Sequence, residues 1–383
     1  MLGYLLCPPV VLGVSAFEQL SSIGAHRAWL LVDPGLASAP KLRLYEEELR
    51  KEGGSVDRFV APPGEPTEAS LGAVQRALES SRPDWIVAIG GGSVLDLAKL
   101  AWVNYERPDG ADLEPVTEGE LGLRRKARFV AVPTTCGSGS EVNGLAYLPA
   151  ANGARGVRSR ELLPDWVLLD PELLETLPPS WIASTGADAL AHALESLLSE
   201  WSHPASAALA REAVGIIVTE LPSAVRHPGR PEPRTQLQVA ATLAGLAAAN
   251  SQLGLVHALA DAAGPRLGVP HSRAVAALLP VGMEFNFPAA RDRIAPLEPA
   301  LGGPAVQSAA AFAARLRTLG EAAGLPRSLE AAGASREALA AARADILTEA
   351  LRSPAMLSNP RLPTPEELGR LLDAAMVGGA LPP

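Results

Sequence analysis

The chain has 383 residues, of which 48% are hydrophobic and 20% charged, so it can build two domains with substantial cores and is not disordered throughout. Its formal net charge of -9 argues against nucleic acid or an anionic membrane as a partner, and no stripe of Lys and Arg overrides that average. A small molecule is the expected partner.

The N-terminal segment MLGYLLCPPVVLGVS is apolar but lacks the basic residues that begin a secretory signal. No apolar run reaches the length of about 18 residues that a membrane span requires. Cys7 and Cys136 are the only cysteines, too few for a disulfide framework. These features favour a cytoplasmic protein that does not associate with a membrane.

Short apolar runs then alternate with helical patterns up to about residue 180. We expect strands at residues 28–33, 55–60 and 85–90, and helices at residues 41–53 and 67–80. This alternation predicts a parallel sheet with right-handed crossovers.

Long Ala- and Leu-rich stretches broken by Pro and Gly follow. We expect helices there, at roughly 182–200, 204–221, 233–262, 271–285, 304–324 and 364–377. The Pro- and Gly-rich residues 286–304 are expected as a loop. The sequence therefore predicts an α/β domain over residues 1–180 and an all-α domain over residues 181–383.

The segment IGGGSVLDLAKL, residues 89–100, joins an expected buried strand to an expected helix through three glycines and a serine. Backbone N–H groups at a helix N-terminus attract phosphate, and glycine leaves room for its approach, so this loop can bind a pyrophosphate. It matches neither the G-x-G-x-x-G fingerprint nor a Walker A motif. A tight strand-to-helix turn that needs glycine is the alternative interpretation.

A second loop, in VAVPTTCGSGSEV (residues 130–142), follows another apolar strand. It offers the hydroxyl groups of Thr134, Thr135, Ser138 and Ser140 to a phosphate, ribose or amide. Two such loops in one α/β domain favour a dinucleotide. Asp33 ends the first expected strand, where it can bind ribose hydroxyls and repel a 2′-phosphate, which favours NAD over NADP. The alternatives are a polar surface loop and, for an Asp before Pro-Gly, an ordinary turn.

Asp188, His192, His257 and His271 form a candidate metal site that uses three of the six histidines. Asp188 and His192 are four residues apart and so share one helix face. His257 and His271 would come from two successive helices. One carboxylate with three imidazoles suits a borderline divalent metal such as iron or zinc. Singly, each residue could be a cap, a surface residue or a hydrogen-bonded core residue, and only the combination favours a metal.

Taken together, the chain resembles the iron-containing (group III) alcohol dehydrogenase family, which is related in fold to glycerol dehydrogenase and dehydroquinate synthase. The resemblance covers nearly the whole chain and includes VLGVSAFEQL, VDPGL, GEPTEASL, GGGSVLDLAK, PTTCGSGSEV, LLDPELLETLPP, TGADALAHALES and SNPRLPTPEEL. It implies an N-terminal dinucleotide-binding α/β domain, a helical C-terminal domain, and a cleft holding nicotinamide and metal. It also implies a homodimer or higher homo-oligomer.

Carried over position by position, the resemblance makes Asp188, His192, His257 and His271 the metal ligands. Its cofactor-binding positions fall on Gly91, Gly92, Ser93, Thr134 and Thr135, with Asp33 on the ribose side and Asp96 in the GGGSxxD motif. The implied cofactors are Fe²⁺, with Zn²⁺ as an alternative, and NAD in preference to NADP.

Asp261 departs from the family pattern. Many members carry a further histidine four residues after the third ligand, near the nicotinamide, where it can relay protons. A carboxylate there can exchange protons with a different pH dependence or contact a different substrate, so Asp261 is the candidate catalytic residue. The family's basic residue after the threonine-rich loop has no clear counterpart, and Arg155 and Arg158 are both candidates.

The expected function is metal-assisted hydride transfer between NAD(H) and a small alcohol or aldehyde. The main alternative is a reductase of an acidic aldehyde or oxo acid, phosphonate- or carboxylate-bearing, which includes maleylacetate reductases. A lyase of the dehydroquinate synthase type is disfavoured because four lysines, at 41, 51, 99 and 126, make no lysine-rich phosphate pocket. A nucleotide-binding assembly protein without catalysis is disfavoured by the complete ligand set.

Overall fold

The computed structural model describes residues 5–107, 117–148, 155–297, 301 and 308–381. The chain falls into two compact units, which we call the α/β unit (residues 7–177) and the helical unit (residue 178 onward, with Leu5 and Leu6). Leu6 belongs to the helical unit because its N–H donates to Asn250 Oδ1 at 2.8 Å and its carbonyl accepts from Asn250 Nδ2 at 3.1 Å. The expected α/β part followed by an all-helical part is confirmed.

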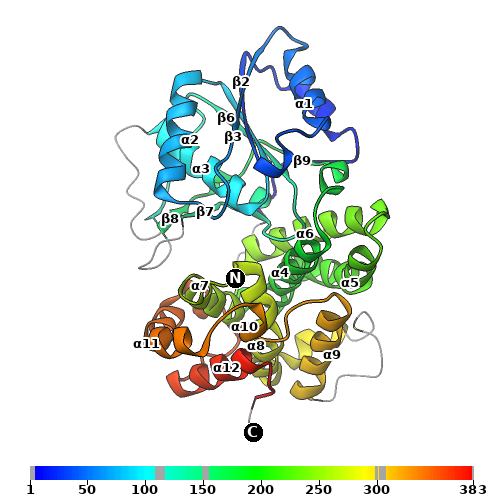
Figure 1. Ribbon diagram of the computed structural model, residues 1–383, viewed down its shortest axis with the longest axis vertical. Helices are drawn as coiled ribbons and strands as arrows, with labels where there is room; N and C mark the ends of the chain where they lie inside the picture. The colour runs from blue at the N-terminus through cyan, green and yellow to red at the C-terminus, as the bar shows by residue number, and fades with distance from the viewer. Residues whose placement is uncertain (1–4, 108–116, 149–154, 298–300, 302–307, 382–383) are drawn as a thin grey trace. The chain divides into compact units, whose positions relative to one another are not determined.

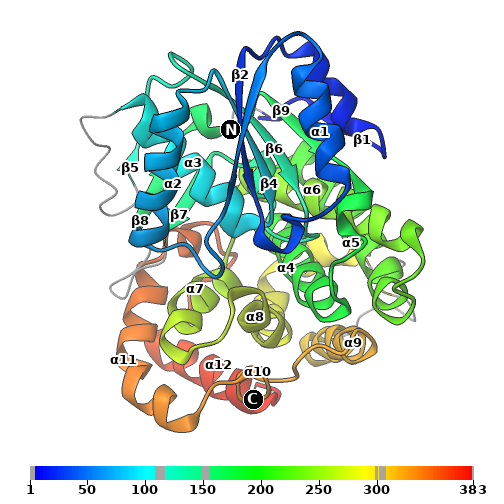
Figure 2. The same cartoon turned by 45° about the horizontal axis from the view of Figure 1, so that its top comes forward.

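A six-stranded parallel sheet forms the centre of the α/β unit (Figures 1 and 2). Its order is β1-β9-β6-β4-β2-β3. The strands are β1 (Val10–Leu12), β2 (Arg27–Val32), β3 (Ser55–Val60), β4 (Trp85–Gly90), β6 (Arg128–Pro133) and β9 (Trp166–Leu169). Every residue of β4 is buried, as expected for a central strand of a parallel sheet that is covered on both faces.

Helices cover both faces of this sheet. Alternate residues of β2, β4 and β6 point to opposite faces, so one set packs under α2 (Glu68–Ser81) and α3 (Gly92–Glu106). The other set packs under α1 (Lys41–Arg50) and the 3₁₀ segment η1 (Ala16–Ser22). The three expected strands and two expected helices before residue 90 are all present, with ends shifted by a few residues.

A small second sheet and four short 3₁₀ segments complete the α/β unit. The sheet has the order β5-β8-β7, with β8 parallel to β5 and antiparallel to β7. Its strands are β5 (Thr117–Glu118), β7 (Leu145–Leu148) and β8 (Arg155–Arg158). The 3₁₀ segments are η2 (Pro34–Leu36), η3 (Ser140–Val142), η4 (Arg160–Leu162) and η5 (Pro171–Leu174).

The helical unit is built around α4 (Pro179–Leu198), which is almost completely buried and packs on α5, α6 and α8. The other elements are α5 (Pro204–Arg226), α6 (Pro231–Ser251), α7 (Leu255–Leu267), α8 (His271–Ile294), η6 (Ala295–Leu297), α9 (Ala309–Ala322), α10 (Leu329–Ala332), α11 (Arg336–Arg352), η7 (Pro354–Leu357) and α12 (Pro365–Val377). Helix α11 was not predicted, because its sequence lacks a clear apolar stripe.

The expected single helix over residues 233–262 is wrong. The structure has two helices, α6 and α7, bent by 104° from one another. The break occurs where Gln252 takes a positive φ of 65° and Gly254 packs tightly, since a Cβ on Gly254 would lie 2.6 Å from Asn359 Oδ1. Tertiary packing thus interrupts a stretch whose own residues favour helix.

The expected loop over residues 286–304 is also wrong in its first half. Helix α8 continues to Ile294, and Pro288 is accommodated by a kink in which Ala290 has φ -129°. The later residues 298–300 and 302–307 lie outside the described part of the chain. Within the described residues no single helix is long and apolar enough to cross a membrane, and α6 and α7 pass that test only as a bent pair.

Candidate metal centre and nucleotide loops

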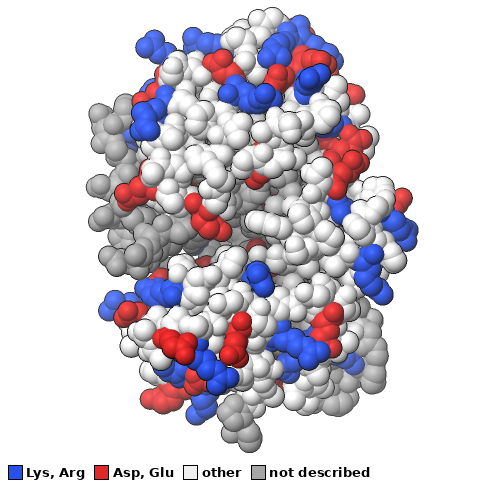
Figure 3. All heavy atoms as spheres, in the orientation of Figure 1, with Lys and Arg blue, Asp and Glu red and all other residues white. Residues whose placement is uncertain are grey.

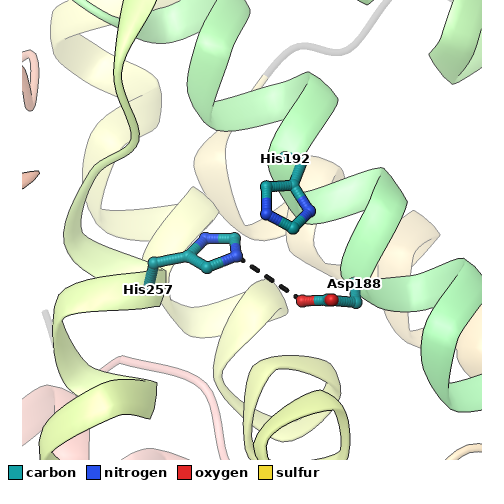
Figure 4. A group of neighbouring side chains, drawn as sticks. All are labelled: Asp188, His192 and His257. Carbon is teal, nitrogen blue, oxygen red and sulfur yellow. Dashed lines mark ion pairs between the residues drawn. The ribbon is translucent and has the colours of Figure 1, made fainter. Parts of the chain in front are cut away.

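Three of the predicted ligands lie together inside the helical unit (Figure 4). Asp188 and His192 project from the same face of α4, as their four-residue spacing requires, and His257 projects toward them from α7. All three are buried, and they offer ligand atoms that lie within 4.8 Å of one another. The bend between α6 and α7 precedes His257 by only a few residues.

The fourth predicted ligand, His271, is the first residue of α8. Its Nε2 lies 3.6 Å from Asp188 Oδ1, and the Nε2 of His257 lies 3.5 Å from the same oxygen. The ring centroids of His192 and His257 are 4.4 Å apart. The structure therefore brings all four residues around one carboxylate oxygen, and we call this group the four-residue cluster.

The polar atoms of the four-residue cluster fit a bound cation. Among the described residues, buried Asp188 Oδ1, His192 Nδ1 and His257 Nε2 have no hydrogen-bond partner. Buried polar atoms are normally hydrogen-bonded, because leaving one unpaired costs about 1–3 kcal/mol. A neutral His257 that donates from Nδ1 turns the lone pair of Nε2 toward Asp188 Oδ1, so two acceptors face one another. A divalent metal held by these residues would resolve that conflict.

In the metal-free chain a proton on His257 takes the place of a cation beside Asp188. Burial and the neighbouring His257 lower the pKa of His192 to about 4, so its ring is neutral at pH 7. Burial raises the pKa of Asp188, but the surrounding histidines outweigh it and hold that pKa well below its ordinary value. Burial also lowers the pKa of His257, while the nearby carboxylates of Asp188 and Glu195 raise it to about 9. A cation therefore competes with protons for this site.

Glu195 is a residue of this site that we did not predict. It lies on α4 one turn beyond His192, is buried, and places Oε2 2.6 Å from His257 Nδ1. Its other oxygen accepts the N–H of Val256 at 2.6 Å. The spacing of Asp188, His192 and Glu195 on one helix face was the available signal.

Asp261, the candidate catalytic residue, lies one helical turn after His257 on α7 and is exposed. Its Oδ1 is 3.2 Å from His271 Nδ1. The structure thus places this carboxylate against a predicted metal ligand. A role in proton exchange or substrate contact stays a prediction.

In the α/β unit, two loops pack against one another. We call residues 90–93 the glycine loop and residues 134–140 the threonine loop. Each follows a strand, β4 or β6, and these strands are neighbours in the sheet. A Cβ on Gly91 would lie 3.0 Å from Thr135 Cγ2, and one on Gly92 would lie 2.7 Å from Ser138 Cβ. Glycine is therefore required for the two loops to meet, and Gly91 caps the N-terminus of α3.

The N–H of Thr134 donates to the carbonyl of Gly90 at 3.1 Å, which fixes the start of the threonine loop. Gly91, Gly92, Thr134 and Thr135 are thus brought together at one edge of the sheet, beside an N-terminus whose N–H groups suit phosphate. Their contact with a cofactor stays a prediction.

The other predicted cofactor residues make contacts within the α/β unit. Ser93 Oγ donates to Glu65 Oε2 at 3.1 Å, and Asp96 Oδ2 accepts the N–H of Tyr147 at 3.1 Å. Asp33 follows β2 and accepts the N–H of Gly35 at 2.8 Å, so the turn-forming role considered for it is observed. Their cofactor roles stay predictions.

Of the two candidate arginines, Arg158 lies on β8, and the side chain of Arg155 lies outside the described part. The sequence leaves open which of the two corresponds to the family's basic residue. The position of Arg158 on β8 does not decide between them.

Lys99 is a second residue that the sequence did not single out. It projects from α3, is fully buried, and donates to the carbonyls of Ser140 at 2.6 Å, Asn143 at 2.7 Å and Leu145 at 3.1 Å. Burial lowers its pKa to about 8, although Asp96 and Glu141 oppose that shift. These hydrogen bonds from the ammonium stabilise the backbone at the end of the threonine loop. A lysine within the apolar stretch LAKLAW was the available signal.

Comparison with known proteins agrees with both halves of this description. The family model described as "Iron-containing alcohol dehydrogenase" matches residues 8–171, and the one described as "Fe-containing alcohol dehydrogenase family, C-terminal" matches residues 182–376. The probable alcohol dehydrogenase EutG of Salmonella typhimurium is 34% identical over 376 residues, covering 96% of this chain and 93% of that protein.

An NADPH-dependent butanol dehydrogenase of Clostridium saccharobutylicum is 32% identical over 305 residues, covering 77% of this chain and 76% of that protein. Among solved structures, a 1,3-propanediol oxidoreductase has a TM-score of 0.90 at 26% identity, covering 98% of this chain and all of that one. These similarities extend over both units.

Proposed function

The chain belongs to the iron-containing alcohol dehydrogenase family, and from this premise we propose that it is a metal-dependent alcohol dehydrogenase. It transfers hydride between a nicotinamide dinucleotide and a small alcohol or aldehyde. The observation that carries the proposal is the convergence of Asp188, His192, His257 and His271, in which the first three are buried and each leaves a polar atom without a hydrogen-bond partner.

Asp188, His192, His257 and His271 would hold Fe²⁺, with Zn²⁺ as the alternative metal. When bound, the metal supplies Lewis-acid polarisation of the substrate oxygen. The chain's own contribution is to keep Asp188 ionised and His192 neutral, as the pKa shifts of both groups indicate. Burial of Asp188, His192 and His257 strengthens the electrostatic interactions among them.

The glycine loop and the N-terminus of α3 would bind the pyrophosphate of the dinucleotide, with backbone N–H groups as donors. Thr134 and Thr135 would add hydroxyl donors. NAD is the proposed cofactor because Asp33, at the end of β2, would repel a 2′-phosphate. The butanol dehydrogenase relative is NADPH-dependent, so the two cofactors must be compared directly.

The proposed partner is a small molecule rather than a nucleic acid. On the face drawn in Figure 3, Lys and Arg side chains are interspersed with Asp and Glu and gather into no large basic patch. The net charge of -9 supports the same proposal. We further propose that the enzyme works in the cytoplasm as a homodimer or larger homo-oligomer, in line with the two cysteines and the family resemblance.

The alternative of an acidic aldehyde or oxo acid finds no support within the helical unit. The further charged side chains that contact the cluster's histidines there are the carboxylates of Glu195 and Asp261, in the part of the chain that the structure describes. Carboxylates repel an anionic substrate.

The test is an aldehyde screen on protein loaded anaerobically with Fe²⁺, with NADH and NADPH assayed in parallel. We expect iron-dependent oxidation of NADH with short neutral aldehydes, and slower turnover with NADPH or with carboxylate- and phosphonate-bearing aldehydes. A protein that binds iron but oxidises neither cofactor with any aldehyde would contradict the proposal. Faster turnover of the acidic aldehydes would favour the alternative.

A further inference from the structure

Two histidines of the four-residue cluster each contact a carboxylate through the ring nitrogen that faces away from Asp188. His257 has Nε2 3.5 Å from Asp188 Oδ1 and Nδ1 2.6 Å from Glu195 Oε2. His271 repeats the arrangement, with Nε2 3.6 Å from Asp188 Oδ1 and Nδ1 3.2 Å from Asp261 Oδ1. Two carboxylates, from α4 and α7, therefore lie behind two predicted ligands.

A neutral imidazole carries one N–H, and an ionised carboxylate can only accept a hydrogen bond. The carboxylate therefore selects the tautomer that is protonated at Nδ1 and leaves the Nε2 lone pair directed at the centre of the cluster. We propose that Glu195 and Asp261 are positioning residues that fix the tautomer and orientation of His257 and His271 and thereby set the metal affinity. This inference rests on the metal site of the proposed function.

Glu195 is itself held rigidly. Its side chain is buried, and its two oxygens accept the N–H groups of Val256 at 2.6 Å and His257 at 3.4 Å, at the N-terminus of α7. Helix N-termini favour negative charge, so this position suits a carboxylate. A Cβ on Gly254 would lie 3.0 Å from Glu195 Oε1, so a larger residue there would crowd this carboxylate. The bend between α6 and α7, where Gly254 lies, therefore also leaves room for the Glu195 carboxylate that contacts His257.

Asp261 is held less firmly. Its side chain is 53% exposed, and its contact with His271 is longer than that of Glu195 with His257. Water competes for an exposed carboxylate, so its hydrogen bond is weaker. The two carboxylates are therefore expected to contribute unequally, with Glu195 the stronger of the two.

The test is a competition titration of Zn²⁺ against a chromophoric chelator, using the full chain. Zn²⁺ takes the same nitrogen and oxygen donors and does not oxidise. Glu195→Gln presents an amide N–H₂ or carbonyl in place of the carboxylate, and we expect the zinc affinity to fall about 10- to 100-fold, as for other partners of metal-bound histidines. Asp261→Asn should cause a smaller loss. Asp373→Asn is the matched control, because Asp373 is 58% exposed in the same unit and pairs with Arg343.

A second readout separates positioning from general stabilisation. In ¹⁵N spectra of the zinc-loaded protein, the His257 ring should show a protonated Nδ1, and Glu195→Gln should alter the signals of His257 but not those of His192. Thermal unfolding of the zinc-free proteins shows whether each variant folds. If Glu195→Gln does not fold, the zinc affinity of Asp261→Asn, measured by the same titration, tests the inference alone.

Wild-type affinity for zinc in both folded variants, or in Asp261→Asn when it alone folds, would overturn the inference and leave the metal site intact. Absence of zinc binding by the wild-type chain would instead overturn the proposed function. The two failures are therefore distinguishable.

Discussion

The candidate sites of the α/β unit and the helical unit use different kinds of chemical group. In the α/β unit the site consists of backbone N–H groups and hydroxyls, and it depends on the absence of side chains at Gly91 and Gly92. In the helical unit the site consists of side chains from α4, α7 and α8, and it depends on the carboxylates behind them. An added methyl group should therefore damage the first site, and a removed side chain the second.

The largest expected effect is removal of the metal. Dialysis against a chelator should reduce aldehyde reduction to background, while NADH still binds, because the glycine loop contains no residue of the four-residue cluster. Fluorescence titration with NADH measures binding, and readdition of Fe²⁺ should restore turnover. Full activity in chelator-treated protein that contains no metal would refute the assignment.

The complementary change is Gly92→Ala in the glycine loop. The added Cβ would lie 2.7 Å from both Cβ and Oγ of Ser138, so the threonine loop must move. We expect NADH affinity to fall by about 10-fold or more, since a displaced loop loses charge-assisted hydrogen bonds to phosphate. Bound metal should not change.

Gly72→Ala is the matched control for that variant. Gly72 lies on α2, where an added Cβ meets only the flexible end of Arg76, at 3.3 Å. This variant should bind NADH like the wild type. Equal NADH affinity in both variants would show that the close approach of the loops has no role in binding.

A smaller effect is expected for Lys99→Met. The variant removes the donor from three backbone carbonyls, one buried and two partly buried, which should lower the free energy of unfolding by about 2–3 kcal/mol. NADH affinity should fall several-fold as the end of the threonine loop loosens, and metal content should stay constant. Urea unfolding and NADH titration measure both, with the exposed Lys51→Met as control. Unchanged NADH affinity would show that Lys99 stabilises the fold but does not affect cofactor binding.

The effect of pH is the smallest, taken one pH unit at a time. Burial lowers the pKa of Lys99 from 10.5 to about 8, so between these values the unfolded chain holds a proton that the folded chain has released. The contribution of Lys99 to the free energy of unfolding therefore rises with pH across this window, by up to about 1.4 kcal/mol per pH unit. The difference between wild type and Lys99→Met should grow accordingly from pH 8 to pH 10. Parallel curves would contradict the lowered pKa.

The two units also differ in how far the sequence predicts them. The glycine loop, the strands around it and the spacing of Asp188 with His192 are local patterns, and the structure reproduces them. Glu195, Asp261 and Lys99 act through partners 10 to 62 residues away in the chain, and no local pattern indicates such pairs. The break between α6 and α7 was missed for the same reason, because the constraint on Gly254 comes from Asn359.

The most direct test of the account is the metal content of His257→Ala, measured by elemental analysis after anaerobic loading with Fe²⁺. We expect about one metal ion per wild-type chain. The variant should hold much less metal and should lose NADH oxidation by short aldehydes while it still binds NADH. Unchanged metal content and an unchanged rate would contradict the assignment of His257 and of the cluster around it.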